Sequence, residues 1–236
     1  MTQTAQNKKY AAELDQLLPH FFPHQLNWHK AKKHKTRHIT ASRQIGCDYY
    51  FAFEALQNAI ATGEDQIFLG GTIAQAQIAF PYIFGFVYKA QLEGLLEGFN
   101  ITCRHPQHLV LPNGAKISFL SPKCRLSSFH GNVYVPNYAW SDNPRNMIAA
   151  ASSLSMYKGN SRTFYTSASD QKGAYEAYQR ILAHRDVWTD KVDLYQAQNG
   201  DSGMLSTLSI EEIKHSFTLD QFNMLMMCQW PQESAE

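Results

Sequence analysis

A short polar loop between an expected strand and an expected helix holds the residues best suited to chemistry. It spans residues 40–48 and contains Gly46. Residues 34–40 are a basic run short enough for one strand, and residues 47–61 repeat apolar side chains at helical spacing before Gly63. A strand, a tight glycine-containing loop and a helix can cradle phosphate, because exposed N–H groups and the positive end of the helix dipole face the anion. The same pattern also fits a plain turn.

The elements that must position this loop follow from the remaining pattern. Short apolar runs alternate with helical patterns, which indicates an α/β fold with a mostly parallel sheet. An Asn-Gly pair at residues 113–114 predicts a hairpin turn. Strands are expected over residues 34–40, 66–69, 109–111, 116–120, 132–135 and 162–166. Helices are expected over residues 10–18, 47–61, 143–156, 173–184 and 209–216, and over 73–96 with Pro81 as a kink; residues 1–9 are expected to be frayed and 196–206 to be a polar loop.

The residues around the polar loop resemble the phosphate-loop region of tailed-phage terminase large subunits, the ATP-driven motors that package DNA. Residues 42–56 carry this similarity and read SRQIGCDYYFAFEAL. Further stretches resemble the same family in its order: residues 21–28, 66–77, 109–120, 127–135, 162–169 and 219–230. The resemblance implies a P-loop NTPase-like three-layer sandwich. It implies an N-terminal helical segment over residues 1–20, an ATPase-like domain over residues 21–230 and a tail over residues 231–236.

The resemblance also shows which catalytic residues are replaced. Phosphoryl transfer needs a cation on the phosphates, a magnesium ligand and an acid that positions water. In close relatives the loop reads KSRQIGAT, so Ala41 stands at the lysine and Asp48 at the magnesium-binding hydroxyl. Pro136 and Asn137 stand where the family has its pair of acids. Asp142 lies beyond this pair and is not expected to replace an acid; Asp142 or Asn143 is expected to cap the next helix.

Other positions of the family's site are retained. The resemblance assigns Gln25 to the adenine edge, since an amide both donates and accepts hydrogen bonds. His24 replaces an aromatic residue there, and residues 21–28 could instead anchor the N-terminal segment. Thr166 and Ser167 fall in the turn that senses the nucleotide state, or in an ordinary strand end. The nucleotide-binding-like set is Gln25, Ser42, Arg43, Gln44 and Gly46.

A basic run precedes the loop. Its cations are Lys30, Lys32, Lys33, Lys35 and Arg37, which could contact a DNA backbone through counterion release or form a solvated face. His34 and His38 have a metal-ligand spacing only on a helix, and this segment is expected to be loop and strand, so no metal site is expected.

Composition limits the remaining possibilities. The 236 residues suffice for one α/β domain, and the formal net charge of +1 means that a DNA contact must come from a local patch. The four cysteines form no C-x-x-C pair, which favours reduced thiols in a cytoplasmic protein, and the family resemblance implies a bacterial host. No signal peptide is recognised and no apolar run reaches the roughly 20 residues of a membrane span.

These observations predict a catalytically inactive, terminase-like binding module of a phage, prophage or satellite. It would act in viral DNA packaging or its interference, and its partners would be portal, small terminase, DNA or further copies of the chain. No cofactor is expected, because the residues that would hold ATP and magnesium are replaced. No endonuclease activity is expected either, because the sequence contains no counterpart of the family's nuclease domain. The alternative is an active packaging ATPase with displaced catalytic residues, or one completed in trans, which would need ATP and magnesium.

Overall fold

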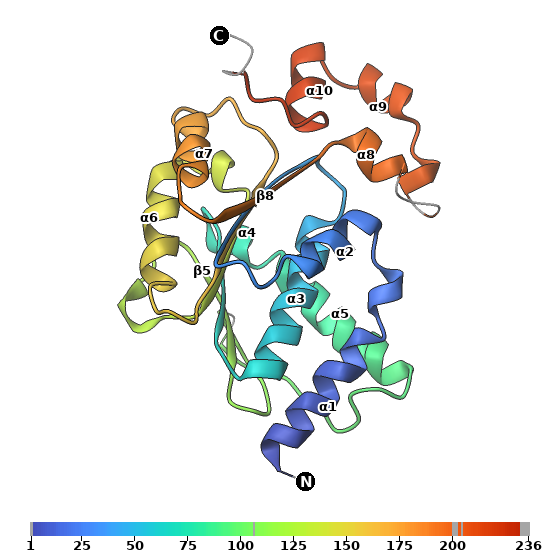
Figure 1. Cartoon of the computed structure of the whole chain (residues 1–236), viewed down its shortest axis with the longest axis vertical. Coiled ribbons are helices and arrows are strands. Elements are labelled where there is room, and N and C mark those ends of the chain that lie inside the picture. The colour runs from blue at the N-terminus through green and yellow to red at the C-terminus, as the bar shows by residue number, and fades with distance from the viewer. Residues whose placement is uncertain (1, 106, 200–202, 204, 232–236) are drawn as a thin grey trace.

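A computed structural model describes residues 2–105, 107–199, 203 and 205–231. In these residues the centre of the fold is one eight-stranded sheet with the order β3-β4-β5-β2-β6-β7-β1-β8 (Figure 1). Strand β4 is antiparallel to both of its neighbours, and the run from β5 to β8 is parallel. The strands are β1 (Thr36–Ala41), β2 (Gln66–Leu69), β3 (Thr102–His105), β4 (His108–Val110), β5 (Lys116–Leu120), β6 (Asn132–Pro136), β7 (Arg162–Thr166) and β8 (Val187–Val192).

Helices cover both faces of this sheet. One side carries α1 (Gln3–Asp15), α2 (Pro23–Lys30), α3 (Cys47–Thr62) and α5 (Ala79–Leu92), and the other carries α6 (Pro144–Leu154) and α7 (Ala174–Leu182) (Figure 1). Near the carboxyl ends of the strands lie α4 (Ile73–Ala76), α8 (Leu194–Asn199), α9 (Ile210–His215) and α10 (Leu219–Leu225). Short 3₁₀ helices span Leu18–His20, Leu126–Ser128, Tyr138–Trp140 and Leu205–Thr207. This confirms the P-loop NTPase-like three-layer sandwich.

Helix α3 is the central helix because almost its whole circumference is apolar. Its residues from Tyr50 to Gln57 are all buried, between the sheet on one side and α1, α2 and α5 on the other. Gly46 begins the helix at φ 83° and Gly63 ends it at φ 75°, both in the left-handed region that glycine adopts without a steric penalty. The helix therefore begins at the predicted residue and ends one residue beyond the prediction.

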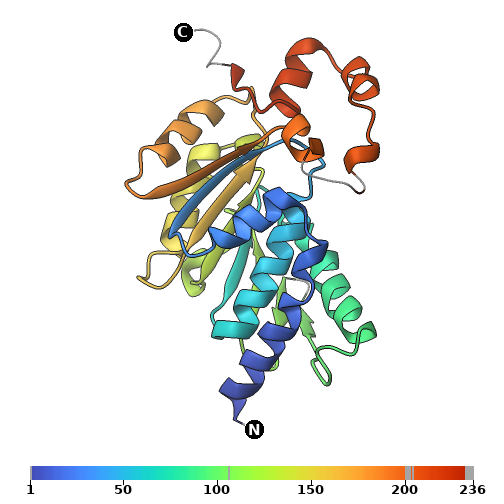
Figure 2. The same ribbon diagram turned by 45° about the vertical axis from the view of Figure 1, so that its right-hand side comes forward.

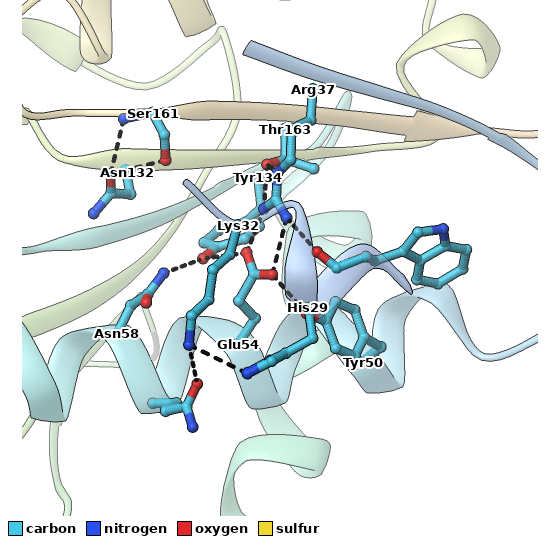
Figure 3. Close-up of polar contacts among 12 residues, drawn as sticks. His29, Lys32, Arg37, Tyr50, Glu54, Asn58, Asn132, Tyr134, Ser161 and Thr163 are labelled. Carbon is cyan, nitrogen blue, oxygen red and sulfur yellow. Dashed lines mark hydrogen bonds and ion pairs between the residues drawn. The ribbon is translucent and has the colours of Figure 1, made fainter. Parts of the chain in front are cut away.

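The core contains one fully buried ion pair (Figure 3). Arg37 on β1 donates through both terminal nitrogens to the two carboxylate oxygens of Glu54 on α3. Tyr50 and Tyr134 donate to the same carboxylate over 2.7 and 3.2 Å, and Thr163 Oγ1 accepts from Arg37 Nε over 3.0 Å. Burial raises the pKa of Glu54 and Arg37 lowers it, with a net lowering, so the carboxylate stays ionised. The network joins α3 to β1, β6 and β7.

Most predicted strands and the hairpin are confirmed. The strands at residues 66–69 and 162–166 have the predicted bounds, the one at 132–135 extends to Pro136, and β1 begins at Thr36 instead of residue 34. Strands β4 and β5 pair antiparallel around Gly114, which has φ 88°. Strands β3 and β8 were not predicted.

The expected helix over residues 73–96 is wrong in two details. It breaks at Gln77 and Ile78 instead of at Pro81, and it ends at Leu92. Pro81 lies in the first turn of α5, where the missing N–H has no intrahelical acceptor to lose.

The N-terminal segment is ordered earlier than predicted. Helix α1 begins at Gln3, and Thr2 caps it by accepting from the N–H of Ala5. Tyr10 donates its hydroxyl to the Glu97 carbonyl over 2.8 Å, and α1 packs against α3. The expected frayed stretch is therefore helical from Gln3 on, and the boundary at residue 20 stays a prediction.

Two further predictions concern the C-terminal half. The expected loop over residues 196–206 is wrong for its first part, which belongs to α8, and residues 200–202 and 204 lie outside the described residues. Asn143, and not Asp142, caps α6: its Oδ1 accepts from the Asn146 N–H over 2.9 Å. No helix in the described part of the chain is long and apolar enough to cross a bilayer.

Candidate nucleotide site

The polar loop of residues 42–46 lies at the carboxyl end of β1, where it is held from two sides. The Ser42 N–H donates to the Val192 carbonyl over 2.8 Å, and the Arg43 N–H donates to the Leu225 carbonyl over 3.1 Å. The loop then turns through Gln44 at φ 65° and Gly46 at φ 83° into α3. Ligands of open α/β sheets bind at this edge, outside the carboxyl ends of the strands.

Helix α2 fixes the conformation of the loop. Gln25 donates to the Gly46 carbonyl over 2.9 Å and accepts from the Phe22 N–H over 3.0 Å, while a ring nitrogen of His24 lies 2.9 Å from the Ile45 carbonyl. A Cβ on Gly46 would lie 2.6 Å from Gln25 Nε2, so a larger residue would displace the Gln25 amide from the loop, in addition to the steric cost of φ 83°. Gln25 is buried and positions the loop, and its predicted contact with adenine stays a prediction.

The N–H groups at the tip of the loop point away from protein acceptors. Within the described residues, those of Gln44, Ile45 and Gly46 have no hydrogen-bond acceptor in the protein. They precede the positive end of α3, which is the backbone geometry of an anion cradle.

The loop opens into a cavity of about 1180 Å³. Of the predicted site residues, the cavity is lined by Gln25, Ala41, Ser42, Arg43, Gln44, Gly46, Asp48, Asn137, Thr166 and Ser167. Pro136 is buried at the end of β6 and is not part of this lining. The fold therefore brings together residues from β1, α2, α3, β6 and β7, as the sequence predicted.

Asp48 lies in the first turn of α3 and is held by the neighbouring strand. The Tyr165 hydroxyl donates to Asp48 Oδ1 over 3.0 Å. Burial raises the pKa of the Asp48 carboxyl, and the Tyr165 hydrogen bond opposes part of that rise. An ionised Asp48 places negative charge where an anion in the cradle would carry its own.

Arg43 is held over an aromatic ring. Its guanidinium carbon lies 4.5 Å from the centroid of the Trp140 ring, and Trp140 Nε1 donates to Ser167 Oγ over 2.9 Å. Such cation–π contacts are worth about 0.5–1 kcal/mol at exposed sites. The chain of contacts joins the loop to the ends of β6 and β7. Trp140 and Tyr165 were not predicted as site residues, because no motif places them beside the loop.

The end of β6 supplies no acid. Asn137 has φ 47°, and its N–H donates to the Tyr165 carbonyl over 2.7 Å. Among the described residues that line the cavity, Asp48 is the only carboxylate. No group of three His, Cys, Asp or Glu side chains that could hold a metal ion occurs in the described residues.

The predicted basic run divides into two parts. Lys30, Lys33 and Lys35 are exposed, whereas Lys32 is half-buried and donates to Gln57 Oε1 over 3.1 Å. The predicted DNA contact of Arg37 is wrong, because Arg37 is 1% exposed and pairs with Glu54. Glu54, buried in an otherwise apolar stretch of helix, was the sequence signal for such a partner.

The sheet order, the glycine loop before α3 and the cavity at the carboxyl ends of the strands define a P-loop NTPase-like protein. A family model described as "Terminase large subunit, T4likevirus-type, N-terminal" matches residues 38–236, and the chain belongs to this family of terminase large subunits.

Related proteins agree with this family. The chain is 28% identical to the probable terminase ATPase subunit of Haemophilus phage HP1 (strain HP1c1), over 89% of this chain and 37% of that protein. It is 27% identical to the terminase ATPase subunit of Escherichia phage P2, over 91% of this chain and 39% of that protein. The chain thus spans less than two fifths of the length of either relative.

Solved structures show the same fold. A mutant form of the Thermus phage P74-26 large terminase ATPase domain superposes with a TM-score of 0.67 at 14% identity, covering 87% of this chain and 92% of that one. The large terminase of bacteriophage HK97 superposes with a TM-score of 0.62 at 14% identity, covering 84% of this chain and 47% of that one.

Proposed function

We propose that this chain is a terminase ATPase-like domain that does not hydrolyse ATP and acts as a binding module in viral DNA packaging or its interference. The observation that carries the proposal is the position of Asp48. It is the only carboxylate among the described residues that line the cavity, and it lies in the first turn of α3, where the family resemblance implies a hydroxyl.

The residues present do not fit magnesium-ATP. Ala41 offers a methyl group where a lysine would counter phosphate charge, and Pro136 and Asn137 offer no carboxylate at the end of β6. Magnesium prefers oxygen ligands in near-octahedral geometry, and carboxylates supply most of its protein contacts. Two like charges 4 Å apart repel by about 4 kcal/mol at an effective dielectric constant of 20. An ionised Asp48 therefore opposes a triphosphate in the cradle.

Binding partners follow from the family and remain part of the proposal. Portal, small terminase and DNA are the packaging components that such a domain would contact, and the source would be a phage, prophage or satellite. The eight-stranded sheet and the loop held by hydrogen bonds to Val192, Leu225 and Gln25 support a binding role, because the proposed replacement of catalytic residues leaves the surrounding fold in place.

One observation favours the second candidate, an active ATPase with displaced catalytic residues or one completed in trans. The unpaired N–H groups of Gln44, Ile45 and Gly46, with Arg43 beside them, preserve an anion cradle. A partner could then supply the missing cation and acids.

Phosphate release separates the two candidates. The purified chain is incubated with magnesium-ATP, with and without double-stranded DNA, and with an Arg43→Ala variant as a matched control. We expect no release above that of the variant in either condition, together with stoichiometric binding to a packaging component. DNA-stimulated release that disappears in Arg43→Ala contradicts the proposal and supports the active ATPase.

A further inference from the structure

The amino-terminal ends of three adjacent parallel strands lie on the edge of the sheet opposite the nucleotide cavity. Thr36 of β1 is in register with Arg162 of β7 on one side and with Val187 of β8 on the other. The Arg162 N–H donates to the Lys35 carbonyl over 2.8 Å. In Figure 2 the start of β1, the loop into β7 and the turn between α7 and β8 lie together on the left side.

Six basic residues gather at these strand ends. Lys33, Lys35, Arg180, His184 and Arg185 are exposed, and Arg162 is half-buried. Burial is the main cause that lowers the pKa of His184, and the charges of Arg162 and Arg180 lower it further. These three side chains therefore lie close enough to interact electrostatically. We call Lys33, Lys35, Arg162, Arg180, His184 and Arg185 the basic edge.

The basic edge is not neutralised within the chain. In the described residues, none of its members forms an ion pair within 4.0 Å. Asp186, which directly follows Arg185, is an acidic neighbour of the edge, and Glu64, which accepts from Asn132 Nδ2, approaches the neighbouring Gly159. The whole chain carries a formal net charge of only +1, so this edge concentrates positive charge that the rest of the surface balances.

Two hydrogen-bond donors at this edge have no acceptor. Arg162 Nε and Asn160 Nδ2 are buried and unpaired, and Asn160 is 8% exposed. Buried polar groups in folded proteins are nearly always paired, with protein or with ordered water, so these two donors have hydrogen-bonding capacity that the described part of the chain does not use. Anionic oxygens are suitable acceptors, because the guanidinium fork binds phosphate through charge-assisted hydrogen bonds.

We propose that the basic edge binds the phosphate backbone of double-stranded DNA. Its cations are distributed over three strand ends about 4.8 Å apart, so they suit a ligand with repeated charges rather than a single small anion. Two strongly exposed apolar side chains, Met156 and Tyr157, lie in the loop into β7 beside the edge, but the edge itself consists of basic side chains and has no apolar centre of the kind that a protein interface normally has. Arg37 and Lys32 of the predicted basic run do not belong to the basic edge, because Arg37 is buried and Lys32 is half-buried. The inference rests on the proposed function, since it names DNA as the partner and gives the surface that binds it.

The test compares two variants of equal charge. The edge variant combines Lys33→Gln, Lys35→Gln, Arg180→Gln and Arg185→Gln, and the control combines Lys8→Gln, Lys123→Gln, Lys172→Gln and Lys214→Gln, all at positions outside the basic edge. Binding of a fluorescent duplex of about 30 base pairs is measured by anisotropy between about 50 and 200 mM salt, because each neutralised phosphate contributes about 0.9 to the slope of log affinity against log salt. Circular dichroism and thermal unfolding confirm that both variants are folded.

We expect the edge variant to lose at least roughly tenfold in affinity and about three units of salt slope, and the control to change less than about threefold. A charge-conserving variant, with Lys33→Arg, Lys35→Arg, Arg180→Lys and Arg185→Lys, should keep the affinity. Equal losses in edge and control variants, or no duplex binding by the native chain at about 50 mM salt, overturn the inference. Competition by poly-L-glutamate as strong as that by unlabelled duplex also overturns it, because the edge would then be a general acidic-ligand surface.

The outcome is independent of the ATPase question. A chain that releases phosphate and still binds DNA through the basic edge contradicts the proposed inactivity and leaves this inference intact. An inactive chain whose DNA binding does not depend on the edge contradicts only this inference.

Discussion

The Tyr165 hydroxyl donates to Asp48 Oδ1 over 3.0 Å and so joins the end of β7 to the first turn of α3. The contact holds a carboxylate at the positive end of the helix, in the same cavity into which the polar loop opens. This pair therefore links the altered loop to the turn that carries Thr166 and Ser167.

Replacing Asp48→Asn should stabilise the protein at neutral pH. Burial raises the pKa of Asp48 in the folded state, so the folded protein binds this proton more tightly than the unfolded chain does. The stability that the protonated Asp48 carboxyl contributes to the native chain is fully present below the pKa of the unfolded state and is lost as the pH rises through the pKa of the folded state. Urea unfolding should give the variant a larger free energy of unfolding at pH 7 and a smaller advantage near pH 4. A variant less stable than the native chain at pH 7 would show that the charge stabilises the helix instead.

Removing Glu54 should destabilise the fold far more than removing a surface partner. Glu54→Gln leaves Arg37 buried without its counter-charge, and breaking a buried pair typically costs about 3–5 kcal/mol. The matched control is Glu176→Gln, which breaks an exposed pair with Arg145 and should cost less than about 1 kcal/mol. Urea unfolding measures both. Equal effects would show that the buried network contributes no more than a surface pair.

His38 should make the protein sensitive to acid. Burial lowers its pKa to about 3, and its Nε2 lies 2.9 Å from the Tyr138 hydroxyl. Because the folded pKa is depressed, stability is present above the unfolded pKa of about 6.5 and is lost as pH falls toward 3, at up to about 1.4 kcal/mol per pH unit. His38→Gln should flatten this slope between pH 6 and pH 4 in urea titrations. Parallel slopes for the two proteins would rule out His38 as the acid-sensitive group.

The sequence predicted which residues meet at the cavity better than it predicted which of the basic residues are exposed. Residues that follow one another in a loop, or that end parallel strands of one sheet, can be assigned to the same edge from the sequence alone. Ala41, Asp48 and Asn137 were assigned in this way, and all three line one cavity. The role of Arg37 depends on Glu54, which lies 17 residues away on another element, and no local pattern reports that pairing. Strand β8 was missed because it mixes polar and apolar residues without a clear alternation and is only partly buried at the edge of the sheet.

Restoring the replaced residues together should restore nucleotide binding. The variant combines Ala41→Lys, Asp48→Thr, Pro136→Asp and Asn137→Glu. Asn137 has φ 47°, so glutamate there costs about 1–2 kcal/mol of strain, and folding must be checked by thermal unfolding.

Asp48→Thr alone is the control for that experiment and should change little, because the lysine is still missing. A folded quadruple variant that binds no magnesium-ATP would show that the residues at these four positions are not what prevents nucleotide binding.

Titration calorimetry of the native chain with magnesium-ATP tests the proposed inactivity most directly. We expect a flat titration and no thermal shift, because the lining residues of the cavity include neither the lysine nor the pair of acids, and Asp48 adds negative charge to it. A dissociation constant in the low micromolar range would contradict this expectation and the proposed function with it.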